Sequence, residues 1–83
     1  MGTLTLLCSA EGRRPSDYLR ENAGSRTQIV SVLQSAVDAQ TLLEVAVLRG
    51  PRAAVAALAD EVISLREVKH GRLVAVAAGS ALP

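Results

Sequence analysis

The sequence has almost no aromatic side chains: it contains one Tyr, no Phe and no Trp among 83 residues. A hydrophobic core must therefore be built from Leu, Val, Ala and Ile, and little aromatic surface remains for stacking bases or sugars. A single cysteine, Cys8, excludes an intrachain disulfide framework and suits a reducing compartment. No window is long and apolar enough for a membrane span, so we expect a cytoplasmic protein that does not bind membranes.

The charge is nearly balanced, with nine basic and eight acidic side chains. The two signs are mixed along the chain, and Arg13-Arg14 is the only basic doublet. This pattern argues against nucleic-acid binding by the domain on its own. A chain of this length fits one domain, which we place over residues 1–83 with a frayed tail at 79–83.

Hydrophobic periodicity changes along the chain in a regular order. Strand-like alternation and β-branched composition predict four strands, at 3–9, 26–37, 41–49 and 72–78, the last preceded by a loop over 67–71. Helical spacing predicts helices at 17–23 and 51–66. The resulting order is βαββαβ, an α+β fold of the ferredoxin-like type, in which two helices cover one face of a four-stranded antiparallel sheet.

The first helix has two possible starts. Ser16 has the side chain of an N-cap residue, and Pro15 is suited to the first helical position. In either case Gly24 is expected to end the helix.

The third predicted strand is apolar on both of its faces. Leu43, Val45 and Val47 point one way. Leu42, Ala46 and Leu48 point the other way, together with the charged Glu44. Two helices cover only one sheet face, so the other apolar face should pack against a second copy of the chain. We predict that this interface contains Val30, Val32, Gln34, Leu42, Glu44, Ala46 and Leu48.

Glu44 is the one charged side chain in that predicted interface. Because burying an unpaired charge is costly, Glu44 should pair with Arg26 or with Arg72 of another chain. An ion pair that fixes the register of two subunits is favoured over a role in binding a ligand.

Three segments carry a family resemblance: GTLTLLC at the start, LLEVAVLRG at 42–50 and ALADEVISLREVKHGRL at 57–73. Together they resemble the C-terminal regulatory domain of the nickel-responsive transcription regulators. The resemblance covers nearly the whole chain and implies the ACT-like version of the βαββαβ fold. It also implies a tetramer of regulatory domains, joined in the full-length protein to an N-terminal ribbon-helix-helix DNA-binding domain.

The resemblance implies nickel ligands that this chain lacks. Members of the family bind nickel through an H-x-H on the second strand, a cysteine before L-E-V and a histidine of another subunit. The matching positions are Gln34, Ala36, Leu42 and Ala23. None of these side chains supplies the thiolate or imidazole that such a site requires. We therefore expect no nickel at the family site and no cofactor.

Two other groups of residues are weaker candidates for a site. If the first and last strands are neighbours, Cys8 and His70 form half of a metal site completed by another subunit; otherwise His70 is hydrogen-bonded locally. Arg13 and Arg14 follow the first strand, where ACT-type domains hold small effectors, and they either clamp an anion or form a solvated loop.

These observations favour a non-enzymatic regulatory and oligomerisation module. Its partners would be copies of itself, as a dimer or a tetramer, or a full-length regulator of the same family. One alternative is a fragment of a metal-responsive, DNA-binding repressor. Another is a small ferredoxin-like enzyme, for which one His, one Tyr and one Cys provide few acid–base groups.

Overall fold

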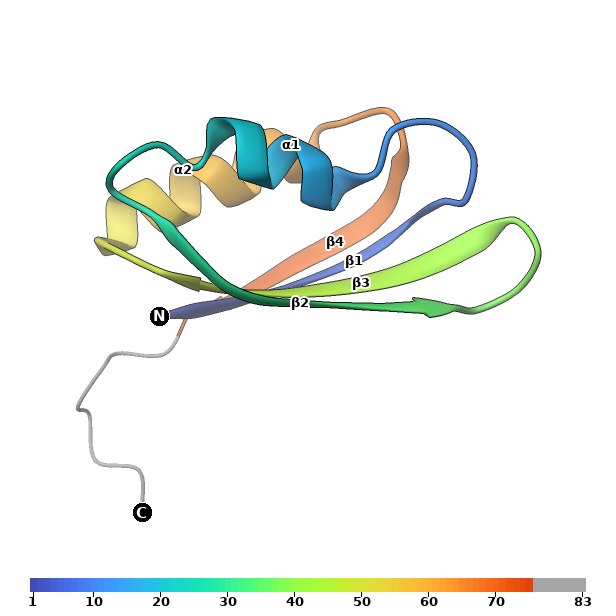
Figure 1. The fold of residues 1–83 in the computed structure, drawn as a ribbon, viewed down its shortest axis with the longest axis horizontal. Coiled ribbons are helices and arrows are strands. Elements are labelled where there is room, and N and C mark those ends of the chain that lie inside the picture. Colours follow the sequence, from blue (N-terminus) through green and yellow to red (C-terminus); the bar gives the residue numbers. More distant parts are fainter. Residues whose placement is uncertain (76–83) are drawn as a thin grey trace, which may run out of the picture.

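The computed structural model describes residues 1–75, and the expected tail at 79–83 and the end of the last expected strand lie outside them. The elements follow the order βαββαβ (Figure 1). Their bounds are β1 Gly2–Ser9, α1 Pro15–Asn22, β2 Gln28–Ala36, β3 Thr41–Arg49, α2 Arg52–Ile63 and β4 Val68–Ala75. The four strands form an antiparallel sheet in the order β2-β3-β1-β4.

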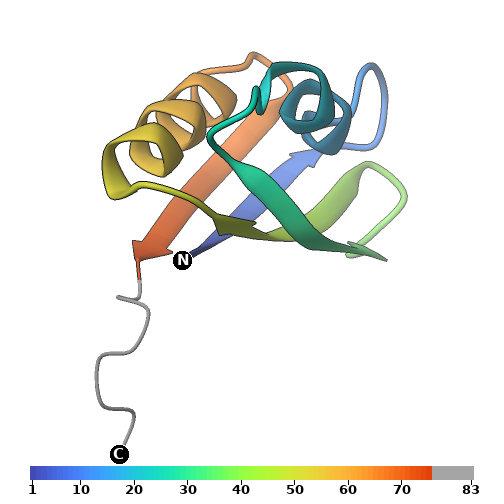
Figure 2. The ribbon, with the colours of Figure 1, turned by 60° about the vertical axis from the view of Figure 1, so that its left-hand side comes forward.

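Both helices lie on the same face of the sheet, as Figures 1 and 2 show. The predicted fold class is therefore confirmed. The core between the layers is aliphatic, and it comes from β1, α1, β3 and α2. Its fully or nearly fully buried members are Leu4, Leu6, Leu19, Ala46, Leu48, Val55, Leu58, Ala59 and Val62. None of the helices within residues 1–75 is long and apolar enough to cross a membrane.

Several element boundaries differ from the expected ones; α2, for example, ends at Ile63 and not at residue 66. Helix α1 begins with Pro15 as its first helical residue and Arg14 at the N-cap, so the alternative with Ser16 as the N-cap is wrong. The predicted loop over 67–71 is also wrong, because β4 begins at Val68. The reason is the length of β1: Ser9 still donates its backbone N–H to the Glu67 carbonyl, and Val68 pairs with Cys8.

The register of β3 places the predicted interface on the face that the helices cover. Leu4 lies opposite Ala46, and Leu6 lies opposite Glu44, so these side chains share one face of the sheet. Ala46, Leu48 and Glu44 are at most 1% exposed beneath the helices. On β2, Val32 and Gln34 pair with Ala46 and Glu44 and share that face, as does Leu42.

The assignment of Val32, Gln34, Leu42, Glu44, Ala46 and Leu48 to an outward interface is therefore wrong. A strand that is apolar on both faces does not show by itself which face points inward. β1 decides this, because Leu4 and Leu6 are apolar whereas Thr3 and Thr5, on its other face, are polar. Val30 is a separate case, because it is the extra residue at an irregularity between Ile29 and Ser31 and is 44% exposed.

The opposite face of the sheet carries the other half of β3. Leu43, Val45 and Val47 are partly exposed there, and no element within residues 1–75 covers them (Figure 2). Leu33 on β2 and Val74 on β4 share this face and are 64% and 50% exposed. We call this surface the open sheet face. The sequence argument that one apolar face lacks a cover thus holds, but with the other set of residues.

Gly71 has a steric role in the packing of α2 on the sheet. A Cβ atom at this position would lie 2.7 Å from Ile63 Cγ1 and 2.9 Å from Leu6 Cδ2. Both distances are shorter than normal carbon contacts, so α2 sits close to β4 only because residue 71 has no side chain.

We therefore expect Gly71→Ala to lower the free energy of unfolding by about 1–3 kcal/mol, and Gly71→Val to lower it further. Urea unfolding at one fixed protein concentration measures the effect. Arg66→Ala, at an exposed position after α2, is the control and should change stability by less than about 0.5 kcal/mol. Equal stability of the Gly71→Val and parent proteins would show that the close approach is unimportant.

Candidate functional site at the start of helix α1

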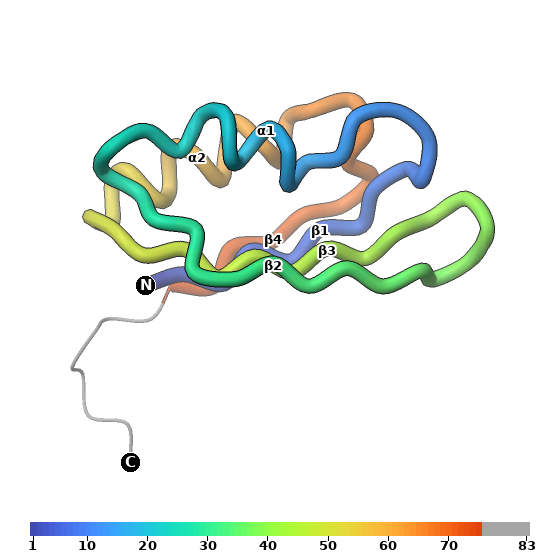
Figure 3. Tube along the Cα trace, in the orientation of Figure 1, coloured from blue at the N-terminus to red at the C-terminus, as the bar shows by residue number. Residues whose placement is uncertain are grey.

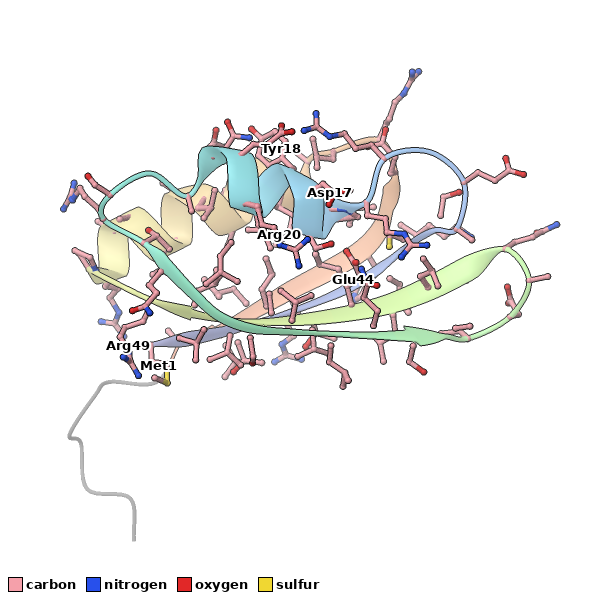
Figure 4. All side chains as sticks on the ribbon, in the orientation of Figure 1. Met1, Asp17, Tyr18, Arg20, Glu44 and Arg49 are labelled. Carbon is pink, nitrogen blue, oxygen red and sulfur yellow. The ribbon has the colours of Figure 1, made fainter. Side chains whose placement is uncertain are left out.

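A buried carboxylate from the sheet caps the N-terminus of α1. The N-cap residue Arg14 makes no side-chain capping bond of its own. Instead, Ser16 donates its backbone N–H to Glu44 Oε1 over 3.0 Å and its hydroxyl to Glu44 Oε2 over 3.0 Å. Figure 4 shows Glu44 between β3 and α1. A carboxylate at this position satisfies a free N–H of the first turn and interacts favourably with the helix dipole.

Gln34 on β2 completes this arrangement from the neighbouring strand. Its side-chain nitrogen donates to Glu44 Oε2 and, over 3.2 Å, to the Ser16 hydroxyl. Its side-chain oxygen accepts a 3.0 Å hydrogen bond from Arg14 Nη1. We call Arg14, Ser16, Gln34 and Glu44 the capping network. The network joins the loop before α1 to β2 and β3, and all the donors to Glu44 are electrically neutral.

The expected ion pair of Glu44 is therefore replaced by hydrogen bonds within one chain. Arg72 is paired with Thr5, on the open sheet face, so it lies on the other side of the sheet from Glu44. Arg26 is exposed and lies between α1 and β2. Neither arginine is a partner of Glu44 in this structure.

Beside the capping network lies a hollow between α1 and β2. Its volume is about 600 Å³. It is lined by Arg14, Ser16, Asp17, Arg20, Val32 and Gln34. In Figure 4, Asp17 and Arg20 lie on α1 near Glu44. Arg20 forms an exposed ion pair with Asp17 over 3.4 Å. This hollow, which we call the α1–β2 hollow, combines a large open volume with two arginine side chains.

The positions that match the nickel ligands are partly brought together. Gln34, Ala36 and Leu42 lie on the helix-covered side of the β2–β3 hairpin, where Ala36 pairs with Leu42. The hairpin extends past the first turn of α1 in Figure 3. Ala23 lies apart from them, at the C-terminal end of α1. Because two of the three hairpin positions are hydrocarbon and the third is an amide held by the capping network, these residues do not fit a nickel ion.

Cys8 and His70 are not brought together. His70 pairs with Leu7, whose side chain is on the open sheet face, whereas Cys8 points toward the helices. The proposed half-site therefore has no geometric basis. The Cys8 thiol is fully buried and lies 3.6 Å from the carbonyl oxygen of Leu42. Burial raises the pKa of the Cys8 thiol, and the nearby charge of Glu44 raises it further. Within residues 1–75, no three His, Cys, Asp or Glu side chains gather in a way that suits a metal ion.

The two neighbouring arginines of the β1–α1 loop have different surroundings. Arg13 forms an exposed ion pair with Glu21 on α1. Arg14 instead contacts Gln34 and lines the α1–β2 hollow. Only Arg14 of this pair therefore belongs to the candidate site.

A sequence profile of the NikR C-terminal nickel-binding domain matches residues 1–76 of the chain. The chain belongs to this family. A nickel-responsive regulator of Geobacter metallireducens, so named provisionally, is 42% identical over 83 residues, which cover 99% of this chain and 60% of the relative. A provisionally named nickel-responsive regulator of Pelobacter propionicus is 41% identical over 80 residues, covering 95% of this chain and 58% of that relative. This NikR-family chain thus spans about 60% of the length of these relatives.

Solved structures with the same fold have very different sequences. The C-terminal domain of the MgtC protein from Mycobacterium tuberculosis has a TM-score of 0.67 and 12% identity, covering 98% of this chain and 92% of that chain. The ACT domain of the GTP pyrophosphokinase of Chlorobium tepidum has a TM-score of 0.62 and 9% identity, covering 92% and 86%. These similarities show that the NikR-family domain has an ACT-like fold. The family is one of domains from nickel-responsive regulators, not of enzymes.

The capping role of Glu44 was missed from the sequence. The sequence contains one signal for it: Glu44 is the only acidic residue of β3, and it lies on the same side of the strand as the buried Ala46 and Leu48. A charged residue at an inward position requires donors. Only the fold shows that these are Ser16 and Gln34.

We expect Glu44→Ala to lower the free energy of unfolding by roughly 1–3 kcal/mol for each buried donor left without an acceptor. Glu44→Gln should cost less, because one amide oxygen still accepts from Ser16, although the amide nitrogen then faces other donors. Chemical denaturation measures both. Glu21→Ala removes a carboxylate from an exposed ion pair and, as the matched control, should change stability by less than about 1 kcal/mol. Similar losses for Glu44→Ala and Glu21→Ala would contradict the capping role.

Proposed function

We propose that this domain is a non-enzymatic regulatory and self-assembly module that does not hold nickel at the family's metal site. The observation that carries this proposal is the state of Gln34, at the first of the family's ligand positions. Its amide is held by Arg14, Ser16 and Glu44 within one chain. The side chain is therefore committed to a structural bond network, and an amide is a poor substitute for imidazole at a nickel centre.

The remaining matching positions support the same proposal. Ala36 and Leu42 have no donor atoms in their side chains, and neither does Ala23. Cys8 lies directly across from Leu42 on β1, so a thiol is present close to the position of the family's cysteine. Burial raises the pKa of this thiol, so forming the thiolate that a metal ligand must be costs more free energy here than at an exposed cysteine.

Replacing the four matching positions tests this proposal. The variant Ala23→His, Gln34→His, Ala36→His, Leu42→Cys restores the ligand types that the family resemblance implies. It should gain saturable nickel binding with a thiolate-to-nickel absorption band, which the parent protein should lack. The same variant with Leu42→Ser in place of Leu42→Cys is the control and should bind without that band. Nickel binding by the parent protein with the same band would refute the proposal.

The second part of the proposal is that copies of the chain pack through the open sheet face. Most of this face is apolar on β2 and β3, where Leu33, Leu43, Val45 and Val47 lie among serines. Within residues 1–75 its paired strand positions carry no acidic side chain, and its arginines are Arg72 on β4 and Arg49 at the end of β3. An apolar surface without charge pairs suits another copy of itself better than a partner selected by charge.

The free energy available from burying the open sheet face is large for a chain of this size. Burying a large aliphatic side chain completely stabilises a structure by roughly 1.5–3 kcal/mol relative to exposing it. Leu33 and Val74 are at least half exposed, so much of this stabilisation is unused in one chain. Assembly would provide it and would also remove an exposed patch prone to aggregation.

Leu33→Lys tests the assembly directly, because Leu33 is 64% exposed and its replacement removes little packing within one chain. We expect the parent protein to sediment as a dimer or tetramer at low micromolar concentration, and Leu33→Lys to shift it toward monomer without changing its circular dichroism. Ala57→Lys, which adds the same charge at an exposed position of α2, should leave the assembly intact. A monomeric parent protein would contradict the proposed interface.

Partners beyond the chain itself follow from the family. In one arrangement the chain assembles with a full-length regulator, and the mixed assembly then has fewer DNA-binding domains than the regulator alone. The other is that this domain is the effector half of a longer metal-responsive repressor, because it spans about 60% of its relatives. We place its action in the cytoplasm, as a regulator that contacts neither nucleic acid by itself nor a membrane. Finding the domain only with itself after purification from native extract would count against hetero-assembly.

A further inference from the structure

The α1–β2 hollow has a donor surplus that points to a ligand. Inside the capping network most hydrogen-bonding groups are already used. The Gln34 nitrogen donates to both Ser16 and Glu44, and the Gln34 oxygen accepts from Arg14. The Ser16 hydroxyl donates its one hydrogen to Glu44. These groups therefore offer an incoming molecule few free hydrogen-bond donors of their own.

The two arginines that line the hollow are different. A guanidinium has five N–H donors. Arg14 uses one of them on the neutral amide of Gln34 and forms no ion pair within residues 1–75. Arg20 makes a single exposed contact to Asp17 over 3.4 Å. Most of the unused hydrogen-bonding capacity around the hollow thus consists of cationic donors, which favour an acceptor with negative charge.

The negative charges nearby do not neutralise Arg14. Glu44 accepts three hydrogen bonds from Ser16 and Gln34 and lies behind them, and the chain leaves it 1% exposed. Asp17 is at the rim, where it is shared with Arg20. Arg14 therefore faces the hollow with its charge unpaired by any carboxylate.

We propose that the α1–β2 hollow binds a small organic oxyanion, a carboxylate or a phosphate ester, through Arg14 and Arg20. The planar fork of a guanidinium matches both groups, and it can bind either one through two parallel hydrogen bonds. Val32 provides an apolar wall for the carbon part of the ligand. A volume of about 600 Å³ suits a small molecule. The inference rests on the proposed regulatory function and names the class of effector that it senses.

The hollow is also connected to the helix start. An anion held by Arg14 would draw this guanidinium from Gln34, which orients Glu44 at the first turn of α1. Binding would therefore be felt at the amide groups of Ser16 and Asp17, in addition to the arginine side chains.

Amide chemical-shift titration of the ¹⁵N-labelled chain tests the site, with succinate, glycerol phosphate, inorganic phosphate and chloride as separate probes at constant ionic strength. Saturable shifts centred on residues 14–20 and 32–34 are expected with succinate or glycerol phosphate. Shifts with inorganic phosphate would show that an oxyanion without a carbon part is sufficient for binding. The organic probe that binds more tightly shows whether the ligand is a carboxylate or a phosphate ester. No saturation with either organic probe in the millimolar range would overturn the proposal.

Arginine variants separate this site from general attraction of anions. Arg14→Ala and Arg20→Ala should each weaken binding by at least about tenfold. Arg14→Lys, which keeps the charge but loses the fork, should weaken it less. Arg13→Ala, at the adjacent residue outside the hollow, is the matched control and should bind normally. An equal loss in Arg13→Ala and Arg14→Ala would overturn the proposed site.

The outcome of the anion-binding experiments does not depend on the outcome of the nickel and assembly experiments. Because one chain supplies all the residues of the hollow, Leu33→Lys should bind the anion as the parent protein does, even if it is monomeric. Failure of the assembly proposal would thus leave anion binding intact. Absence of anion binding would leave the conclusions about nickel and assembly unchanged.

Discussion

The carboxylate of Glu44 is the charge on which the arrangement of this domain depends. It lies under α1 beside the aliphatic core and is 1% exposed, and a buried ionised group is stable only if donors surround it. Ser16 provides two of these donors from the first turn of the helix, and Gln34 provides another from the edge strand. The same contact therefore satisfies a helix terminus, fixes α1 over β2 and β3, and orients the residues beside the α1–β2 hollow.

This interaction holds the start of α1 on the sheet without a metal ion at the positions that the resemblance assigns to nickel ligands. Metal ligands hold elements together through bonds to one ion, and hydrogen bonds between side chains can hold the same elements without an ion. In this chain Gln34 joins Glu44, Ser16 and Arg14. The start of α1 is thus tied to the hairpin by the protein itself, and Arg14 is positioned with most of its donors free.

β3 connects the core with the proposed assembly. Its inward residues Ala46 and Leu48 are buried beneath the helices, whereas Val45 and Val47 point to the open sheet face. A strand in the middle of a sheet with only one covered face does not need apolar side chains on both sides for folding alone. We propose that the additional apolar residues pack between chains, and for this reason the regulatory module and self-assembly belong to one proposal.

The sequence by itself determined the element order and the fold class, because these depend on local periodicity. It also predicts that the chain lacks the nickel ligands that the family resemblance implies, because that depends on residue identity at motif positions. It also showed that β3 is apolar on two sides, but it did not show which side faces the helices. Strand register decided that: pairing with Leu4 and Leu6 turns Ala46 and Glu44 inward and leaves Val45 outside. Register likewise separated Cys8 from His70 and brought Ser16 to Glu44, 28 residues away in the chain. Such contacts depend on the pairing of distant strands, where a shift of one residue exchanges the two faces, so only the tertiary structure decides them.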